Sequence, residues 1–301
     1  MDNSHVLVSI GVPVYNGERF LRFALESLLS QTHTNIEIII SDNASTDATE
    51  DICRSYAARD KRIQYYRNEK NFGAARNYNI TVEKAKGKYF KWAAHDDMCD
   101  PMLIEKCVDV LEREPKVSLA YPQTIIIDDN GDFKSNHEDK FNFREPEAHL
   151  RWVQFCKAPL DCNAVFGVMR TDTLKKTPRI GAYESSDRVL LGEMALRGEI
   201  AEVQGRLFLR RYHGRISTNV HATKESMAKW FDPASTGHFS RTKRFVEYMK
   251  SIFRPSMSFV QRVYCMYHLT LFYLQPVRWI RLVKGLFVAR FKDVRTAGNQ
   301  I

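Results

Sequence analysis

The feature that most constrains the fold of this chain is a regular alternation of strand-like and helix-like segments over its first 120 residues. Short apolar runs rich in β-branched residues, typical of buried parallel strands, alternate with segments whose apolar residues recur at helical spacing. We expect the strands at residues 6–12, 36–41, 62–67 and 88–94. Such alternation produces βαβ units, so the sequence predicts an α/β fold with a mixed, mainly parallel sheet flanked by helices.

Capping patterns predict where the helices in this part begin. Asp47, with Glu50 three residues later, predicts a capping box that opens a helix ending near residue 58. Asp100 is expected to cap a later helix that has Pro101 at its first position. A helix between them is expected over residues 71–85.

The second half of the chain has a less regular pattern. It predicts strands at 117–121 and 124–128 with a hairpin turn at 130–131, a loop over 134–144, a strand at 163–170, a helix at 186–197 and a strand at 206–211.

Composition narrows the class of protein. The 301 residues are 44% hydrophobic and 27% charged, which fits a soluble globular protein with a sizeable core. The six cysteines form no C-x-x-C pair, so we expect neither a zinc cluster nor a redox pair, and we expect a reducing compartment. Because the N-terminus shows no signal-peptide pattern, we expect a cytoplasmic location.

The net charge of +9 is concentrated at the C-terminal end. Residues 241–301 hold 12 Lys and Arg against 2 Asp and Glu, whereas residues 1–240 hold 33 against 34. This distribution argues against nucleic acid as the substrate and predicts an anionic partner for the tail alone. Residues 277–291 alternate aromatic and aliphatic residues with Arg and Lys, as an interfacial amphipathic helix does. We expect peripheral membrane attachment there; the alternative is a helical pair packed on the rest of the chain or a homodimer contact.

Four polar segments lie where predicted strands end or helices begin, which is where α/β sheets bind ligands. They are residues 13–17, Asp42, the run His95-Asp96-Asp97, and the run around Asp187. Each also has an ordinary structural interpretation, respectively a turn capped by Asn16, a loop carboxylate, a solvated turn and a helix cap.

Chemistry gives these segments a second interpretation. Tyr15 could face a flat ring, and Asp42 could accept a hydrogen bond from a base or a sugar hydroxyl. Asp96 and Asp97 repel each other, and a divalent cation such as Mg²⁺ or Mn²⁺ relieves that repulsion. Proteins usually hold these cations with one or two carboxylates together with substrate phosphates. Asp187, at a helix start, could act as a general base.

In combination, the order and spacing of these segments resemble glycosyltransferase family 2, the inverting nucleotide-sugar transferases of the GT-A fold. The resemblance covers roughly residues 6–235. The matching segments are V-S-I-G-V-P-V-Y-N-G-E-R-F-L, E-I-I-I-S-D-N-A-S-T-D, N-F-G-A-A-R-N-Y-N, W-A-A-H-D-D-M-C-D-P, C-N-A-V-F-G-V-M-R, S-S-D-R-V-L-L-G-E-M-A-L-R-G and R-R-Y-H.

The resemblance implies a role for each matching residue. It implies that the base, most often uracil in this family, is held by Pro13, Tyr15, Asn16 and Asp42, and that Asn71 and Arg76 line the nucleotide and diphosphate pocket. Asp96 would contact the ribose or the sugar, Asp97 would hold Mn²⁺ or Mg²⁺, and Asp187 would be the catalytic base. His213 could approach the metal or the diphosphate, or be a surface loop histidine.

One position departs from the family pattern. The family often has E-D or D-D before the helix of the base, and here the chain has S-D, so the nearest other carboxylate is Glu184, three residues earlier.

The implied activity is transfer of a sugar, with inversion, from a nucleotide-diphosphate sugar to a hydroxyl of a glycan or lipid-linked acceptor. The implied setting is cell-surface polysaccharide or glycolipid synthesis in a microbe. The implied domains are a catalytic domain over 1–240, with a nucleotide half to about 120 and an acceptor half from 121, and a helical extension over 241–301.

Two other functions stay open at this point. A degenerate transferase kept as a membrane-associated binding or scaffold module would share the fold but lose turnover. A sugar-nucleotide pyrophosphorylase would need a Gly-rich segment with a basic residue after the first strand, where this chain has Pro-Val-Tyr-Asn. P-loop chemistry is excluded because the sequence contains no G-x-x-x-x-G-K-[ST].

Overall fold

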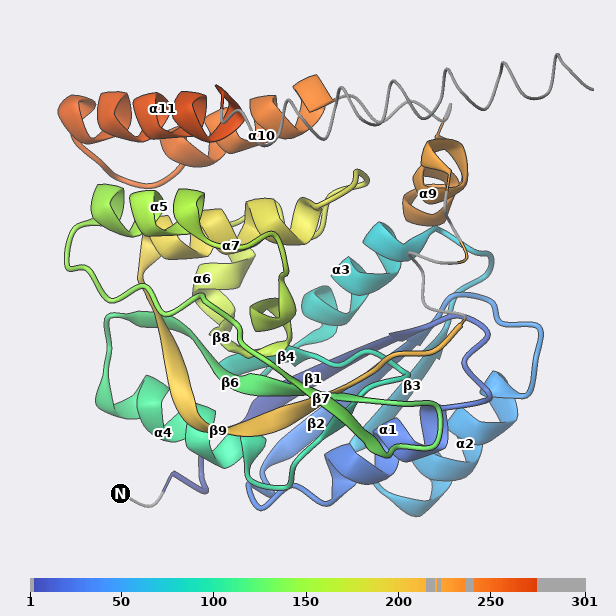
Figure 1. Ribbon diagram of the computed structural model, residues 1–301. Coiled ribbons are helices and arrows are strands. Elements are labelled where there is room, and N and C mark those ends of the chain that lie inside the picture. The colour runs from blue at the N-terminus through green and yellow to red at the C-terminus, as the bar shows by residue number, and fades with distance from the viewer. Residues whose placement is uncertain (1–2, 215–219, 221–222, 236–240, 275–301) are drawn as a thin grey trace, which may run out of the picture.

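A computed structural model describes residues 3–214, 220, 223–235 and 241–274. One mixed sheet crosses the molecule in the strand order β3-β2-β1-β4-β8-β6-β9-β5, and β7 pairs with β6 (Figure 1). The strands are β1 Val8–Val14, β2 Ile36–Asp42, β3 Ile63–Arg67, β4 Tyr89–Trp92, β5 Met98–Cys99, β6 Val117–Ile127, β7 Phe133–His137, β8 Val168–Arg170 and β9 Glu199–Arg211. Strands β1 to β4 pair in parallel, as does β6 with β9, which confirms the predicted α/β class.

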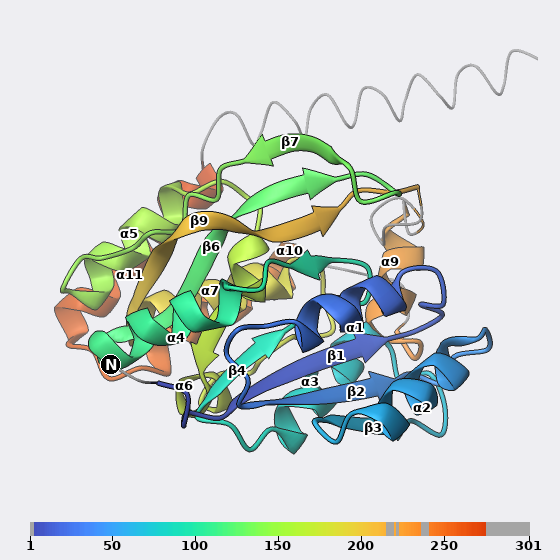
Figure 2. The ribbon, with the colours of Figure 1, turned by 90° about the horizontal axis from the view of Figure 1, so that it is seen from below.

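Helices cover both faces of the sheet. Figure 2 shows α1 Leu21–Leu29, α2 Thr49–Arg59 and α4 Leu103–Arg113 on one face. The opposite face carries α3 Ala74–Lys84, α5 Ala148–Lys157, α6 Thr171–Lys175 and α7 Ser186–Arg197. Each face has its own apolar cluster, and both clusters draw residues from the first and the second half of the chain.

The first strands form where the apolar runs predict them because both of their faces are covered. Every residue of β1 and of β2 is buried, as expected for parallel strands between two layers of helices. Helix α3 packs so closely on β1 that a Cβ added at Gly11 would lie 2.3 Å from the Thr81 hydroxyl oxygen. Close packing on the sheet therefore requires glycine at this position.

Three predictions for the second half were wrong. The strands expected at 117–121 and 124–128 are one strand, β6, whose pairing with β9 shifts register at Pro122, so the proline falls at an irregularity rather than ending the strand. The loop expected over 134–144 begins with β7, which pairs with β6 through the predicted turn at Gly131. The strand expected at 163–170 is a short 3-10 helix, Asn163–Phe166, followed by β8.

The predicted helix caps were also wrong. The residue before α2 is Ala48, which provides no side-chain cap. The Asp47 carboxylate instead accepts hydrogen bonds from the backbone N–H groups of Glu18 and Thr49. Helix α4 begins two residues after Pro101. At Asp47, the N–H of Glu18 in the loop after β1 takes one of the carboxylate oxygens. At Asp100, the carboxylate accepts the N–H of Met102 in the turn before α4, so it lies two residues too early to cap the helix itself.

Two helices of the C-terminal extension, α10 Arg241–Phe253 and α11 Phe259–Leu274, pack on α7 and α5 (Figure 1). Their residues Tyr248, Cys265 and Phe272 are buried in the same apolar cluster as α7. In the described part of the extension, the helical-pair alternative is therefore what the structure shows. The segment 277–291 lies outside the described residues, and the domain division at residue 240 stays a prediction. No helix among the described residues is long and apolar enough to cross a membrane.

Candidate active site

The predicted nucleotide residues on β1 and its following loop lie at the carboxyl edge of the sheet. Pro13 is buried within β1, and Tyr15 just beyond it is 43% exposed. Asn16 has a φ of 51°, and its side-chain oxygen accepts the N–H of Thr46 at 2.9 Å, while its own N–H donates to the Ser45 hydroxyl. Asn16 therefore does not cap α1, which begins five residues later, but ties the loop after β1 to the loop after β2.

Asp42 ends β2 and is fully buried. One carboxylate oxygen accepts the Ser45 N–H at 2.9 Å, and the other accepts the Tyr65 hydroxyl at 2.8 Å. Burial, with the adjacent Asp42 charge, raises the pKa of Tyr65, so this hydroxyl keeps its proton and keeps donating. Because both oxygens already have protein partners, the role of Asp42 in holding a base stays a prediction.

Asn71 and Arg76 come from the region of α3. The side-chain oxygen of Asn71 accepts hydrogen bonds from the Asn43 amide and the Gly73 N–H, which joins the turn before α3 to the end of β2. Arg76 is exposed and pairs with Glu83 on the same helix at 2.5 Å. A role for either residue in binding nucleotide stays a prediction.

Asp96, Asp97 and His213 form one cluster, although more than 100 residues separate the carboxylates from the histidine. Nε2 of His213 lies 3.0 Å from a carboxylate oxygen of Asp96, and the imidazole packs on the ring of Phe20 at 4.7 Å. The backbone N–H of Arg211 donates to Asp97 at 2.8 Å. The end of β9 therefore positions both carboxylates that follow β4.

The two carboxylates of this cluster have opposite pKa shifts. Burial and the neighbouring Asp96 charge raise the pKa of Asp97 to about 7. Burial acts in the same direction on Asp96, but the charge of His95 and the hydrogen bond from His213 outweigh it and hold the pKa of Asp96 below its usual value. The cluster thus contains one buried carboxyl group whose ionisation stays unfavourable, although the charges of Arg210 and Lys91 act in the opposite direction.

This charge imbalance fits a divalent cation at Asp97. Within the described ranges, no three His, Cys, Asp or Glu side chains converge to hold a metal on their own. Mg²⁺ and Mn²⁺ are commonly held by one or two carboxylates together with substrate phosphates, which matches a single ligand at Asp97. Nε2 of His213 is engaged by Asp96, so the structure supports a metal role more directly for Asp97 than for His213.

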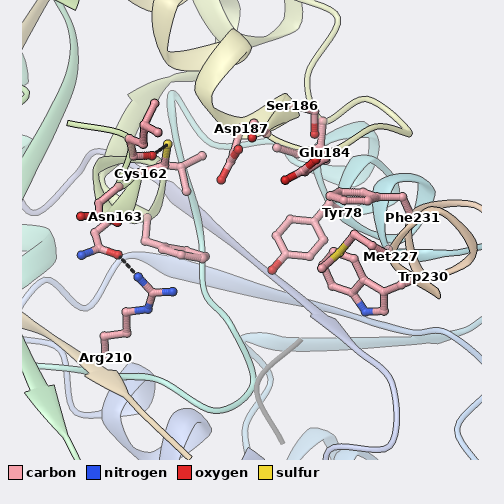
Figure 3. A pocket seen from close by; sticks show the side chains of 17 residues that line it. Tyr78, Cys162, Asn163, Glu184, Ser186, Asp187, Arg210, Met227, Trp230 and Phe231 are labelled. Carbon is pink, nitrogen blue, oxygen red and sulfur yellow. Dashed lines mark hydrogen bonds between the residues drawn. The ribbon is translucent and has the colours of Figure 1, made fainter. Parts of the chain in front are cut away.

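A cavity of about 360 Å³ lies between α3, α7 and α9 Lys224–Phe231 (Figure 3). Asp187 is the one predicted site residue among the described residues that line it. It lies in the first turn of α7, after Ser185 with a φ of 61°, and its carboxylate points into the cavity. Burial raises the pKa of Asp187, against the opposing effects of Arg188 and, more weakly, Arg210. A carboxylate with a raised pKa at the wall of a cavity is suited to proton transfer.

Arg188, the next residue, is fully buried and holds α7 in place. Its guanidinium donates to the backbone carbonyls of Phe155, Ala158 and Pro159 at the end of α5. It also lies 5.5 Å from the ring centre of Phe272 on α11. Arg188 therefore fixes the position of Asp187, the residue before it, relative to α5 and α11.

Two residues interact electrostatically with both Asp187 and the carboxylate cluster. Burial and then the charges of Asp96, Asp97 and Asp187 raise the pKa of Tyr78 on α3. Arg210 of β9 lowers the pKa of both Asp97 and Asp187, and donates to the Asn163 side chain at 2.7 Å. Asp187 and the cluster are therefore coupled electrostatically through Tyr78 and Arg210.

A family profile described as Glycosyl transferase family 2 matches residues 9–174, more than half of the chain. The chain belongs to glycosyl transferase family 2.

Curated relatives of this family-2 chain come from several microbes. An uncharacterised glycosyltransferase of Rickettsia typhi is 44% identical over 107 residues, which are 36% of this chain and 32% of that protein. One from Haemophilus influenzae is 28% identical over 223 residues, 71% of this chain and 68% of that protein. The chain spans only about a fifth to a third of the length of the first relatives it matches.

Solved structures confirm the GT-A fold. Residues 1–349 of Staphylococcus aureus TarS, in complex with UDP-GlcNAc, superpose with a TM-score of 0.63 at 18% identity, covering 88% of this chain and 71% of that one. The mannosyltransferase PcManGT from Pyrobaculum calidifontis, in complex with GDP-Man and Mn²⁺, superposes with a TM-score of 0.54 at 14% identity, covering 96% and 82%.

Sequence reasoning missed two residues of this family-2 site, Tyr78 and Arg210. Tyr78 lies inside an amphipathic helix, where an aromatic residue is expected to be part of the core. Arg210 was noted only as a neighbour of His213, because a single arginine in a strand has no distinguishing local pattern. The separation of 23 residues between Asp187 and Arg210 does not indicate that the two lie close together in the fold. They line the same cavity because the long strand β9 runs back to it and places Arg210 there.

Proposed function

We propose that this protein is an inverting glycosyltransferase that transfers a hexosyl-type sugar from a nucleotide-diphosphate donor to an acceptor hydroxyl. One observation carries the proposal: Asp187, with a raised pKa, faces a cavity that Arg210 also lines, and the next residue, Arg211, donates its backbone N–H to Asp97. Two successive residues of β9 thus connect the cavity of the candidate base with the candidate cation site.

In the proposed reaction, Asp187 removes the proton from the acceptor hydroxyl while that oxygen bonds to the anomeric carbon of the donor. The bond from the anomeric carbon to the diphosphate oxygen breaks, and the nucleoside diphosphate leaves from the opposite face, so the configuration inverts. Arg210 lines the cavity with Asp187 and can stabilise negative charge that develops on the diphosphate. A divalent cation held by Asp97 and the phosphates would supply further positive charge to the leaving group.

We propose a uridine diphosphate sugar as the donor. The support is the polar edge formed by Tyr15, Asn16 and Asp42, and the structure of similar fold, TarS, that was solved with UDP-GlcNAc. The competing donor is a guanosine diphosphate sugar, because PcManGT, which also has a similar fold, was solved with GDP-Man and Mn²⁺.

Calorimetry tests the donor and the metal together. UDP, GDP, CDP and dTDP are each titrated with and without Mn²⁺, and turnover of the matching nucleotide sugars is followed by release of the nucleoside diphosphate. Mn²⁺-dependent binding of UDP with turnover is the expected result. Binding without any turnover would favour the scaffold alternative, and preferential binding of another nucleotide would overturn the uridine assignment.

We further propose that the extension attaches the enzyme to an anionic membrane surface on the cytoplasmic side, where it could meet a lipid-linked or cell-surface glycan acceptor. One side of α11 is apolar and exposed among the described residues, with Phe259 78%, Val260 74% and Tyr267 58% exposed. The two helices are also basic, since α10 and α11 together contain five Lys and Arg and one acidic residue. Apolar side chains flanked by cations suit the headgroup region of an anionic bilayer.

Vesicle co-sedimentation of the full chain tests this attachment. Wild type is expected to pellet with vesicles containing anionic lipid and not with neutral ones, and the double variant Phe259→Glu/Val260→Glu is expected to stay in the supernatant. Phe133→Glu on β7, 66% exposed in the wild type, is the matched control. Equal pelleting of the double variant and the wild type would contradict the proposal.

A further inference from the structure

We propose that the cavity beside Asp187 is the acceptor subsite, and that it binds an uncharged sugar ring against an aromatic wall contributed by α3 and α9. This inference rests on the proposed function and adds the chemical class of the acceptor. The aromatic wall consists of Tyr78 on α3 and Met227, Trp230 and Phe231 on α9.

The cavity has two chemically different sides. Figure 3 shows the aromatic wall on one side, Asn163 and Arg210 on the opposite side, and the Asp187 carboxylate between them. A sugar ring has an apolar face of C–H groups and a rim of hydroxyls, so it can place the face on the wall and direct one hydroxyl to Asp187. A volume of about 360 Å³ is in the range of small-molecule sites, roughly 300–1,000 Å³.

The residues that line this cavity differ from those predicted to bind the nucleotide. Asp187 lines it, whereas the predicted nucleotide residues Tyr15 and Asp42 lie at the ends of β1 and β2 and are not among the described lining residues. A nucleophilic hydroxyl must contact the base, whereas the nucleotide must not. The cavity therefore lies on the acceptor side of the base.

The charges of the lining select against anionic acceptors. Asp161, Glu184 and Asp187 are the described carboxylates of the cavity, and Arg210 is the described cation. Three negative groups against one positive group would repel a uronate or a phosphate ester. A ring that offers only hydroxyl or amide groups is compatible with them.

A buried hydroxyl without a partner also points to a ligand. Ser186 is 1% exposed, lines the cavity next to Asp187, and its Oγ has no hydrogen-bond partner in the part of the chain that the structure describes. Leaving such a group unpaired is unfavourable, because its bonds to water are lost without replacement. A sugar hydroxyl bound between Ser186 and Asp187 would supply the missing partner.

The aromatic wall is held by close packing against the start of α3. Thr223 and Ser226 form a capping box that opens α9, and Ala228 is fully buried. At the other end of α9, a Cβ added at Gly73 would lie 2.4 Å from the Phe231 carbonyl oxygen. The rings of Trp230 and Phe231, 4.7 Å apart, are thereby kept beside Tyr78.

Saturation-transfer NMR with methyl glycosides tests sugar binding without relying on turnover. Methyl glycosides are chosen because they have no aromatic group that could stack on a tryptophan by itself. The panel contains neutral hexosides, N-acetylhexosaminides and a glucuronide. We expect at least one neutral glycoside to bind wild type, binding to fall at least about tenfold in Trp230→Ala, and most of it to return in Trp230→Phe. Phe133→Ala is the control. Absence of binding by every neutral glycoside, or equal binding of the glucuronide, would overturn the proposal.

Kinetic measurements then distinguish a failure of this inference from a failure of the proposed function. In Trp230→Ala, the KM for the glycoside should rise at least about tenfold, while the donor KM and slow donor hydrolysis stay within about twofold of wild type. A proportional rise of the donor KM would place the donor sugar, not the acceptor, on the aromatic wall and would overturn the inference. A wild-type protein that binds the glycoside but turns over no nucleotide sugar would refute the proposed function and leave the sugar site standing.

Discussion

At the scale of single residues, the site depends on carboxyl groups whose environments push their pKa values apart. Asp96 is held ionised by His213 and His95, whereas burial raises the pKa of Asp97 and of Asp187. Separated pKa values allow neighbouring carboxylates to take different roles, one accepting a proton and another holding a cation.

Replacing Asp187 by Asn should stop transfer and stabilise the fold. Because the general base is lost, we expect kcat to fall by about 10²- to 10⁴-fold, while nucleotide binding stays nearly unchanged. Because the pKa of Asp187 is higher in the folded protein than in the unfolded chain, its ionisation destabilises the fold once the pH exceeds the unfolded value of about 3.9. Asn removes that cost at pH 7. Kinetics and thermal unfolding check both effects; retained activity would refute the base assignment.

The pH dependence of the wild-type enzyme follows from the same shift. Asp187 must be ionised to accept a proton, and burial moves its pKa upward, so kcat/KM should fall on the acid side at a higher pH than an ordinary aspartate would give. The measurement is a pH–rate profile at saturating metal. An acid limb at or below the usual range of aspartate would argue against Asp187 as the base.

Asp97→Asn should weaken the metal-dependent part of donor binding. The amide removes the negative charge that a cation would neutralise, so we expect Mn²⁺ to improve nucleotide affinity much less than in wild type, by about tenfold less. Titration of nucleotide at several Mn²⁺ concentrations measures this. Asp47→Asn, at a carboxylate outside the cluster, is the control, and an unchanged Mn²⁺ dependence would refute the role of Asp97.

At the scale of elements, the position of α9 depends on one turn. Gly73 has a φ of 84°, and its Cα faces the carbonyl of Phe231, so Gly73→Ala adds both backbone strain and a clash. We expect a loss of about 1–3 kcal/mol in unfolding free energy. We also expect weaker binding of methyl glycosides, with donor hydrolysis preserved. Gly214→Ala is the control, because a Cβ there meets no atom of the described residues within 4 Å. Unchanged stability and unchanged glycoside binding would show that the turn does not hold the helix.

At the scale of the whole molecule, the extension completes the core of the catalytic fold. Five residues of α10 and α11 are buried in the cluster that also contains α7: Tyr248, Ile252, Cys265, Leu269 and Phe272. Each large apolar side chain contributes roughly 1.5–3 kcal/mol when buried, against a net stability of about 5–15 kcal/mol for a typical protein.

A chain ending at residue 240 should therefore lose most of its stability. We expect a broad, low-temperature unfolding transition or aggregation, whereas a chain ending at residue 274 should keep a cooperative transition. Circular dichroism during heating measures both. An unfolding midpoint for the shorter chain equal to that of the full chain would contradict this account. For the same reason, membrane binding is better tested with substitutions on α11 than with truncation.

The sequence was sufficient to predict the first four strands and the family, for different physical reasons. Buried parallel strands are apolar on both faces, so β1 and β2 are visible as continuous runs. The helix starts were predicted less well, because Asp47 binds the N–H of a residue in another loop instead of forming a capping box. The aromatic wall could not be predicted, since Tyr78 and Trp230 are 152 residues apart and meet only through the packing of α9 on Gly73.

The buried Arg188 has a consequence for engineering this protein. It follows Asp187 directly and contacts both the end of α5 and Phe272 of α11, so α5, α7 and α11 are held together through one side chain. In chimeras that combine halves of two family members, a junction at residue 240 would pair this arginine with a foreign helix. Donor and acceptor preferences are therefore best exchanged with α5, α7, α10 and α11 taken from the same parent.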